Sequence, residues 1–449
     1  MRMWTVKSES GTLRSVLVHS AGLSQWWKIP IPGTHPLTSH RTLKQTYPYE
    51  EAVAEHGRII DFLSGEGVRV FELNRVLDEV VEGASLGERA EIIDEVWGEK
   101  EPRPSADDLE AEHLVYGYPP RPLYDEERDE FVVSSGQRGS IYTRDISFMT
   151  PIGLVVSKMK YEGRWEQPKV ARLAFERHPE LRENVEIVCD VSGVEDEVDF
   201  SHAWIEGGDV LVVDEETVLC GVGQRSNLLG MRHVMERVFE GDTDEGIRTF
   251  CAVRIPGPLP CGGHLDVFLN FPDARKALVM PYVFGSELVP GFPERKLLTK
   301  LSEKLISLPG LRSRLREGLR LANFEGSGMC DVYRRGGDGR PTKVSRRENV
   351  IDFLVEEDKV DPDGVVMVGG EPEGEKDVGH LVRALQEGLR EAGNIVTIKP
   401  GLIIAYDRNA ATNESLEDHG VRIRRLPTAH LDMLGGPHCM TMPLHRDAA

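Results

Sequence analysis

Short runs of Val, Ile and Leu recur along the chain, mostly bounded by Gly, Asp or Pro, and this pattern predicts buried β-strands. Their apolar character is nearly continuous rather than alternating, as expected for strands covered on both faces. The predicted strands fall within residues 15–19, 152–158, 209–223, 277–284 and 401–406.

Helical patterns lie near four of these runs. In residues 49–67, apolar side chains such as Ile59 and Leu63 recur at helical spacing, and the pattern ends on glycine. Residues 225–239 and 377–393 show the same kind of spacing. Strands that alternate with helices predict an α/β fold. The similarity between these units hints at a repeated module, but it is too weak to establish a repeat by itself.

Two segments interrupt this alternation, and we interpret them as insertions in a single domain that spans residues 1–449. Residues 73–130 are acidic and contain the helical pattern "GERAEIIDEVW", which predicts a partly helical insertion. Residues 288–345 contain a basic stretch followed by "RRGGDGRPTK", which predicts a helical insertion. The basic stretch could present an amphipathic surface to anions, but a solvated helix is the better explanation.

The composition narrows the classes of partner. The chain is 40% hydrophobic and 29% charged, which permits a large core, and its net charge is -21. Such a charge argues against a nucleic-acid partner and would favour a cationic small substrate, although a negative surface also serves solubility. The first residues lack the apolar run of a signal peptide, and no stretch approaches the roughly 18 apolar residues that cross a membrane. The six scattered cysteines include no CxxC pair, as expected in a reducing cytoplasm.

Four polar clusters carry the residues that could perform chemistry. They read "YTRD" (142–145), "EGGD" (206–209), "HLD" (264–266) and "GGPHCMTMP" (435–443). Taken singly, each has a structural explanation: a turn, a β-turn, a buried histidine or an inert cysteine. Taken together, each pairs a charged or nucleophilic group with glycines or a strand end, where functional loops are carried.

A thiol and a histidine together permit nucleophilic catalysis. Several carboxylates nearby would raise the pKa of the thiol and so weaken it, unless they serve to hold a cationic substrate. A guanidinium group fits best, because its planar fork of N–H donors matches paired carboxylates. The alternative is a metal site, for which plausible zinc ligands are present. The spacing matches no standard zinc pattern, so we predict no metal at Cys261, His264, Asp266, His438 and Cys439.

The four clusters, in this order, resemble the arginine deiminase family of guanidino-group modifying enzymes. The segments "SGTLRSVLVHSAGL" and "NIVTIKPGLIIAYDRNAATNESLEDHGV" resemble it too, so the likeness runs nearly end to end and is weakest in the two insertions. The resemblance implies a five-bladed, pseudo-symmetric α/β propeller (a pentein-type fold) with helical insertions. The site would lie at its axis, closed by the loop that carries Cys439.

The resemblance also implies hydrolysis of L-arginine to L-citrulline and ammonia without a cofactor, through a thiouronium intermediate. Cys439 would attack the guanidinium carbon. His264, oriented by Glu206, would act as general acid and base. The implied substrate-binding residues are Asp145 and Asp266 at the guanidinium nitrogens, Asp209 beside them, and Arg164 and Arg225 at the substrate carboxylate.

Two positions depart from the family pattern. Gly139 stands where members often have asparagine, and Leu434 where many have arginine, so recognition of the amino acid end is less secure than the chemistry. An amidinotransferase and a non-catalytic guanidino-binding protein therefore stay open as alternatives. The sequence does not fix the oligomeric state, and a homo-oligomer is one of the states that it leaves open.

Overall fold

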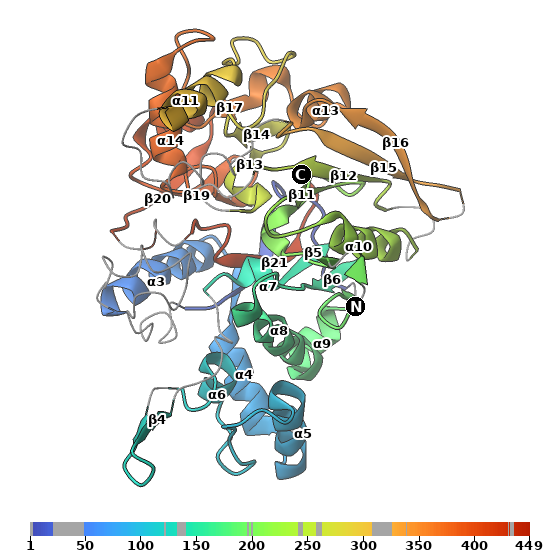
Figure 1. The fold of residues 1–449 in the computed structure, drawn as a ribbon, viewed down its shortest axis with the longest axis vertical. Helices are drawn as coiled ribbons and strands as arrows, with labels where there is room; N and C mark the ends of the chain where they lie inside the picture. Colours follow the sequence, from blue (N-terminus) through green and yellow to red (C-terminus); the bar gives the residue numbers. More distant parts are fainter. Residues whose placement is uncertain are drawn as a thin grey trace.

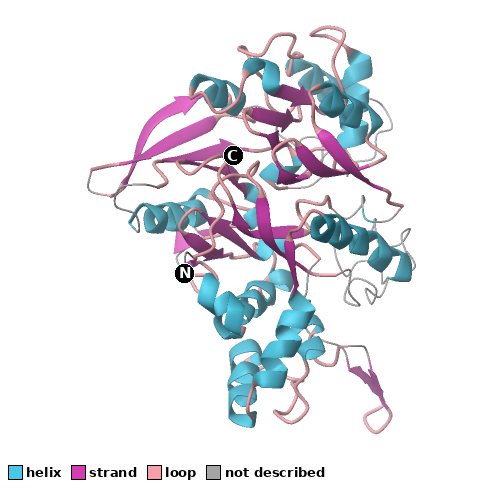
Figure 2. Cartoon of the chain, turned by 180° about the vertical axis from the view of Figure 1, so that it is seen from behind, coloured by secondary structure: helices cyan, strands magenta, loops and turns pink. Residues whose placement is uncertain are grey.

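The fold comes from a computed structural model, which describes most of the 449 residues (Figure 1). The described residues are 3–20, 49–120, 123–132, 141–194, 197–198, 201–240, 246–256, 263–307, 326–337, 339–429, 431 and 435–449. Helices and strands alternate through this part of the chain, which makes the protein an α/β protein, as predicted (Figure 2).

Five sheets of at least three strands share one pattern within the described residues. In each, a first strand runs antiparallel to a central strand, and the central strand runs parallel to a third. A parallel pair requires a crossover connection, and helices fill these crossovers. The repeated unit is thus strand, strand, helix, strand. The last strand of the chain completes the first sheet.

The strands, sheet by sheet, are β21 (Thr441–Arg446), β1 (Leu13–Val18) and β2 (Arg69–Glu72); β5 (Ser147–Thr150), β6 (Gly153–Val156) and β7 (Ile187–Asp190); β10 (Val210–Val212), β11 (Thr217–Val222) and β12 (Thr249–Arg254); β13 (Leu269–Asp273), β14 (Lys276–Val279) and β17 (Val365–Met367); β18 (Val396–Lys399), β19 (Leu402–Tyr406) and β20 (Arg422–Leu426). The crossover helices are α3 (Tyr49–Gly65), α8 (Glu166–Arg177) with α9 (Pro179–Asn184), α10 (Leu228–Glu240), α13 (Val350–Glu356) and α15 (Ala410–Asp418). Helix α14 (Val378–Gly388) joins the fourth sheet to the fifth.

All five predicted strands and all three predicted helices are present, with two differences. Residues 209–223 form the two strands β10 and β11 rather than one, because the acidic stretch 214–216 makes the turn between them. In 277–284 the strand stops at Val279, shortly before Pro281. Proline has no N–H to donate to a ladder, so it is suited to ending a strand.

The first insertion lies at one end of the molecule's long axis (Figure 1). Its helix α4 (Leu73–Gly83) buries apolar side chains at helical spacing, and Ser85 and Glu88 form a reciprocal capping box at the start of α5 (Leu86–Trp97). The segment also holds α6 (Ala111–Tyr116) and the hairpin of β3 (Leu123–Asp125) and β4 (Glu130–Val132). The described residues of 73–130 are thus partly helical, while their being an insertion stays a prediction.

The second insertion is helical only in part. Helix α11 (Lys296–Ser307) matches the prediction, but β15 (Cys330–Arg335) and β16 (Pro341–Arg347) form a hairpin that joins the third sheet beside β12. The prediction of helix was therefore wrong for this part of 288–345. Burial alternates along β15, but abundant arginine in these short strands obscures the period in the sequence.

Candidate active site

The four motifs predicted to carry chemistry meet in the middle of the fold. Helix α7 (Thr143–Ile146) carries Asp145, and it contacts both β21 and the 3-10 helix η2 (Gly207–Asp209). Helix η2 in turn contacts η3 (Leu265–Val267), which carries Asp266. Cys439 lies just before β21, separated from the strand by one residue. The structure thus brings together side chains that the sequence separates by almost 300 residues, and all of them are buried.

The two glycines of "EGGD" are required by close packing at this meeting point. A Cβ on Gly207 would stand 2.0 Å from the backbone oxygen of Arg144. A Cβ on Gly208 would stand 2.8 Å from Cγ of His264 and 3.0 Å from Asp145 Oδ1. Both separations are too short for any side chain, so glycine at these positions lets η2 approach α7 and the His264 ring.

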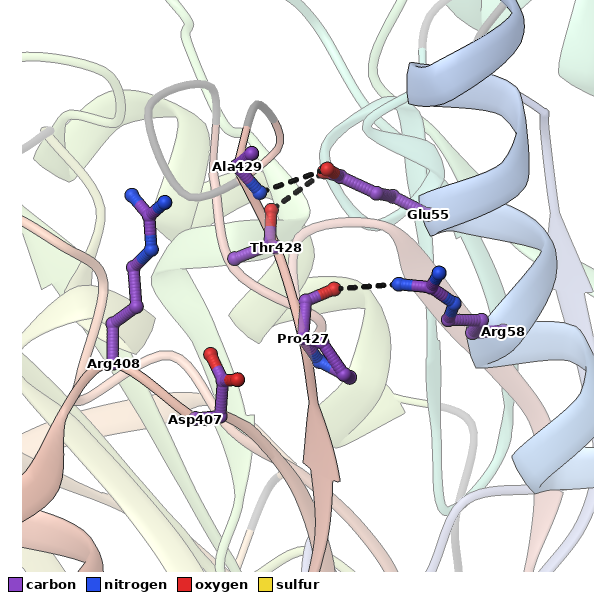
Figure 3. Close-up of a pocket in the computed structure, with 7 residues that line it drawn as sticks. All are labelled: Glu55, Arg58, Asp407, Arg408, Pro427, Thr428 and Ala429. Carbon is purple, nitrogen blue, oxygen red and sulfur yellow. Dashed lines mark hydrogen bonds between the residues drawn. The ribbon is translucent and has the colours of Figure 1, made fainter.

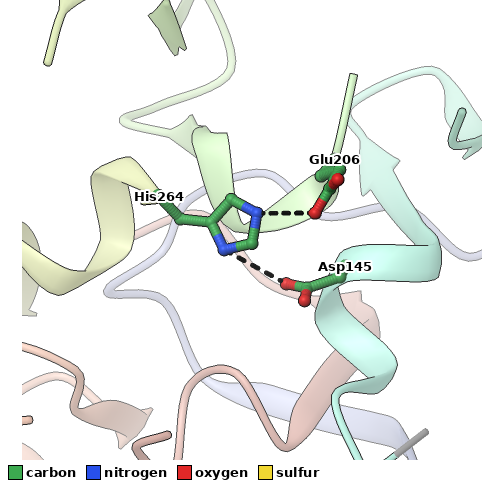
Figure 4. Close-up of side chains that lie close together, drawn as sticks. All are labelled: Asp145, Glu206 and His264. Atoms are coloured by element: carbon green, nitrogen blue, oxygen red, sulfur yellow. Dashed lines mark hydrogen bonds and ion pairs between the residues drawn. The ribbon is translucent and has the colours of Figure 1, made fainter. Parts of the chain in front are cut away.

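His264 lies between two carboxylates (Figure 4). Its Nε2 is 2.9 Å from Glu206 Oε2, and its Nδ1 is 3.6 Å from Asp145 Oδ1. Burial by itself would lower the pKa of His264, but the charge of Asp145 and the hydrogen bond to Glu206 outweigh it and raise the pKa to about 9. The ring is therefore an imidazolium at neutral pH.

Cys439 is buried, with 7% of its surface exposed. Asn394 holds it twice: the Asn394 side chain accepts from the Cys439 backbone N–H at 3.0 Å and donates to Sγ at 3.1 Å. Asp266 Oδ2 is 3.6 Å from Sγ. Burial, together with the charges of Asp266 and Asp145, raises the pKa of the thiol well above its usual range. Without a bound cation, the thiol stays protonated.

Behind the thiol, a buried chain of charged groups fixes Asp266. His438 Nδ1 is 2.8 Å from Asp266 Oδ2, and Arg144 Nη2 is 2.7 Å from His438 Nε2. Because arginine can only donate, Nε2 must accept and the proton must sit on Nδ1, from which it is donated to Asp266. Glu9 pairs with Arg144 through two hydrogen bonds of 3.1 and 3.2 Å. The result is an ionised Asp266, whose pKa is lowered by the His438 hydrogen bond in spite of its burial.

Two buried carboxylate oxygens at the centre have no hydrogen-bond donor among the described residues. They are Asp145 Oδ1 and Asp266 Oδ1. Each carboxylate has a partner elsewhere, Arg164 and His264 for Asp145 and His438 for Asp266, so these two oxygens lack a hydrogen-bond donor rather than charge compensation. Native structures rarely leave such buried acceptors unsatisfied. The residue before Asp145 donates its backbone N–H to the Cys439 carbonyl at 3.2 Å, so both oxygens lie in the neighbourhood of the thiol. The site is arranged to receive a cation with N–H donors.

Two arginines contact the same carboxylates. Arg164 Nη1 is 2.9 Å from Asp145 Oδ2 and 3.5 Å from Glu206 Oε2, while Arg225 Nη1 is 3.1 Å from Glu206 Oε2. The charge of Arg225 helps hold the pKa of Glu206 low against the effect of its burial. In this structure both guanidinium groups therefore face the carboxylates, rather than an open position for a substrate carboxylate.

Asp209 is engaged by the protein itself. Its Oδ2 accepts from Ser226 Oγ at 2.6 Å and its Oδ1 accepts from the Leu265 backbone N–H at 2.9 Å. Burial raises the pKa of Asp209 to about 7. These contacts place Asp209 between the "EGGD" and "HLD" motifs, where it holds the segment that follows His264.

A metal ion would have one candidate set in the described part of the chain. Ligand atoms of Asp145, Glu206 and His264 lie within 4.8 Å of one another. The set fits a metal poorly, because a raised pKa keeps the His264 ring protonated and Arg164 already supplies positive charge to both carboxylates. This set shares only His264 with the zinc alternative considered from the sequence, and Cys261 lies outside the described residues.

Sequence reasoning missed several groups at the site. Asn394 opens the late segment that resembles the family, yet nothing in its local pattern assigns it a role. Glu9 and Arg144 were not singled out, and His438 was considered only as a metal ligand. The signal that could have found them is adjacency, since Arg144 and His438 directly precede Asp145 and Cys439. Gly139 and Leu434, the two departures from the family pattern, lie outside the described residues.

Comparison with known proteins agrees with this geometry. The family model described as arginine deiminase matches residues 128–296 and 377–446, more than half of the chain. The chain belongs to the arginine deiminase family. The match leaves out residues 1–127 and 297–376, which include most of the two predicted insertions.

Curated relatives named arginine deiminase match nearly end to end. One from Oenococcus oeni is 23% identical over 98% of this chain and 97% of its own. Another from Latilactobacillus sakei is 22% identical over 98% of both chains, and one from Bacillus thuringiensis is 23% identical over 98% of both. At this identity the family is shared, while a particular activity does not follow from the likeness.

Solved structures support the same fold. An inosamine-phosphate amidinotransferase from Streptomyces griseus matches with a TM-score of 0.51 and 15% identity, over 100% of this chain and 98% of its own. A saxitoxin-pathway amidinotransferase from Microseira wollei matches with a TM-score of 0.50 and 12% identity, over 99% and 98%. These likenesses concern the fold alone.

Among the described residues, no helix has the length and apolar character of a membrane span.

Proposed function

We propose that this protein hydrolyses L-arginine to L-citrulline and ammonia through a covalent intermediate on Cys439. The observation that carries the proposal is the pair of buried, donor-free oxygens of Asp145 and Asp266 close to a buried thiol and an imidazolium. A guanidinium group carries a permanent positive charge and presents its N–H donors in one plane. It can therefore supply the hydrogen-bond donors that these two oxygens lack among the described residues. Family membership supports arginine as the source of that group.

In the proposed reaction, the substrate provides the charge that the thiol needs. A guanidinium between the two aspartates would offset the carboxylate charges that raise the pKa of Cys439, so the thiol could release its proton to solvent. The thiolate then attacks the guanidinium carbon. The attack converts the planar centre into a tetrahedral adduct bonded to sulfur.

His264 moves the protons in both halves of the reaction. Glu206 holds Nε2, so Nδ1 is the nitrogen left to face the reacting group. Nδ1–H protonates one nitrogen of the adduct, the C–N bond breaks, and ammonia leaves a thiouronium on Cys439. The neutral ring then takes a proton from water, and hydroxide adds to the carbon. The C–S bond breaks to release the thiolate, and the added hydroxyl group loses its proton to solvent as it becomes the carbonyl of citrulline.

We assign Arg164 and Arg225 to the substrate carboxylate. Because both contact carboxylates in the empty site, substrate binding must shift at least part of these pairs. The arriving guanidinium would take over the charge compensation that Arg164 gives Asp145, which frees Arg164 to turn toward the other end of the substrate. Lys160 also adjoins the site, since its backbone N–H donates a hydrogen bond to Glu206 Oε1 at 3.0 Å.

This assignment predicts a preference for arginine over agmatine, its analogue without the carboxylate. A hydrogen bond to a charged group contributes about 1.5–3 kcal/mol, so two such contacts give roughly two to four decades in kcat/KM if they add. Arg225→Ala should reduce this ratio, mainly by weakening arginine. Arg225→Ala also removes the contact of Arg225 with Glu206, and this loss should slow turnover of both substrates alike. The ratio of the kcat/KM values for arginine and agmatine therefore isolates the effect of the substrate carboxylate. Equal kcat/KM values for the two substrates on the unaltered protein would remove the carboxylate clamp from the proposal.

We further propose that the five repeated sheets are the blades of a pseudo-symmetric α/β propeller, with the insertions outside it. The shared strand pattern and the completion of the first sheet by β21 support this arrangement. The four motifs enter the site from different sheets, as expected for a site on the axis. On this proposal, the whole chain forms a single catalytic domain.

The runner-up function is an amidinotransferase, which passes the amidino group from Cys439 to an amine instead of water. The two solved structures described above are amidinotransferases, but a shared fold does not determine whether water or an amine accepts the amidino group. The deciding experiment incubates the purified protein with arginine, with and without an added amine, and measures citrulline, ammonia and ornithine. We expect stoichiometric citrulline and ammonia and no amine dependence. Ornithine with a modified amine would favour the transferase, and no turnover would favour a binding protein.

A further inference from the structure

One carboxylate binds the segment through which the chain returns to Cys439. Glu55, on α3, accepts hydrogen bonds from Thr428 Oγ1 at 2.6 Å, from the Ala429 N–H at 2.8 Å and from the Leu431 N–H at 3.0 Å. Glu55 is 6% exposed. Figure 3 shows its side chain reaching from the helix to this segment. A buried glutamate with several donors from one short stretch of backbone is a specific clamp rather than a solvated surface charge.

The clamp ties together distant parts of the chain. Helix α3 connects two strands of the first sheet, β1 and β2. The segment that Glu55 binds follows β20, which is a strand of the fifth sheet. Beside Thr428 and Ala429 lies a cavity of about 430 Å³, also lined by Arg58 and Asp407 (Figure 3). Among the described residues, Thr428 and Ala429 border this cavity on one side, so the hydrogen bonds to Glu55 contribute to fixing their position.

Further along, two more side chains hold the same stretch. Tyr406 donates its hydroxyl to the Gly435 carbonyl at 2.7 Å, and Asn394 holds Cys439. A Cβ on Gly436 would stand 2.4 Å from Asn394 Cβ, so this part of the loop lies directly on Asn394. The described residues of 428–439 thus have anchors at the start, the middle and the thiol. Glu55 supplies the first and is the one farthest from the reacting atoms.

We infer that Glu55 is a positioning residue for the nucleophile. By fixing the start of residues 428–439, it sets how Sγ of Cys439 stands between Asn394 and Asp266. The inference rests on the proposed function for its effect on turnover, while its effect on the loop does not depend on any reaction. A nucleophile displaced by about 1 Å can lose on the order of 100-fold in rate, so a remote anchor can influence chemistry without touching the substrate.

The test compares Glu55→Ala, Glu55→Gln and Thr428→Val with a matched control, Glu66→Gln. Glu66 follows the same helix and pairs with Lys399 and Arg424, away from the loop. The measurements are amide hydrogen exchange of a peptide covering 427–440, the rate of Cys439 alkylation by iodoacetamide mapped by mass spectrometry, and kcat and KM for arginine. Thermal unfolding of each variant reports the global stability.

We expect Glu55→Ala to speed exchange in 427–440, change the Cys439 alkylation rate and lower kcat roughly 10- to 100-fold, with KM nearly unchanged. Glu55→Gln, which keeps one acceptor oxygen, should recover part of each effect, and Glu66→Gln should show none. If Glu55→Ala does not fold, the Gln and Thr428→Val variants decide. Exchange and alkylation equal to the unaltered protein would overturn the inference. Changed exchange and alkylation in a protein that does not hydrolyse arginine would keep it and reject the proposed function instead.

Discussion

Cys439→Ala should abolish arginine turnover while leaving the fold intact. Removal of a nucleophile of this kind lowers kcat by about six orders of magnitude in well-studied hydrolases, which here means activity below detection. The substitution removes only one sulfur atom from a loop that Asn394 still holds through the Cys439 backbone N–H. Circular dichroism and thermal unfolding should therefore stay close to those of the unaltered protein.

The control for this variant is Cys189→Ala. Cys189 lies on β7, away from the site, and burial raises the pKa of its thiol to about 11. That variant should keep full activity. Acid quenching of the unaltered protein during turnover should trap an adduct on the peptide that contains Cys439, visible by mass spectrometry. Turnover by Cys439→Ala near the normal rate, or an adduct on another residue, would show that a different nucleophile operates.

The sequence predicted the elements that depend on local pattern. The runs of Val, Ile and Leu became strands because apolar side chains in short runs find burial on both faces of a sheet, as in β6. The convergence of Asp145, Glu206, His264 and Cys439 was also predicted, but from family resemblance. Spacing alone could not bring together residues so far apart in the chain.

What sequence could not predict depends on tertiary contacts. The glycines before Cys439 do not show in the sequence what the loop packs against; in the structure they let it press against Tyr142 and Asn394, and the thiol is buried. Glu55 is one acidic residue among several in its helix, and its contacts with Thr428, Ala429 and Leu431 arise only when the chain returns from β20. The hairpin of β15 and β16 escaped notice because charged residues dominate its short strands.

His264→Asn should lower turnover by about 10²- to 10⁴-fold, the usual contribution of a general acid–base. The pH dependence gives the sharper test. The reaction begins with the imidazolium, and the pKa of His264 is raised to about 9, so kcat/KM should fall as the pH rises through about 9. The guanidinium group of arginine keeps its charge over this range, but the α-amino group of arginine also titrates in the alkaline range, so the assignment of the limb to His264 rests on its shift in the variants.

Glu206→Gln tests whether this limb belongs to His264. The carboxylate of Glu206 is hydrogen-bonded to Nε2 and stabilises the imidazolium, so removing its charge must lower the pKa of His264. The alkaline limb should then move to lower pH, in a protein whose kcat is already reduced by the altered ring orientation. His264→Asn should show no limb of this kind. A limb that stays near pH 9 in both variants would mean that it belongs to another group, either the α-amino group of the substrate or a different proton donor. If turnover were also near normal in His264→Asn, the part played by His264 would shrink to holding Asp145 and Glu206 apart.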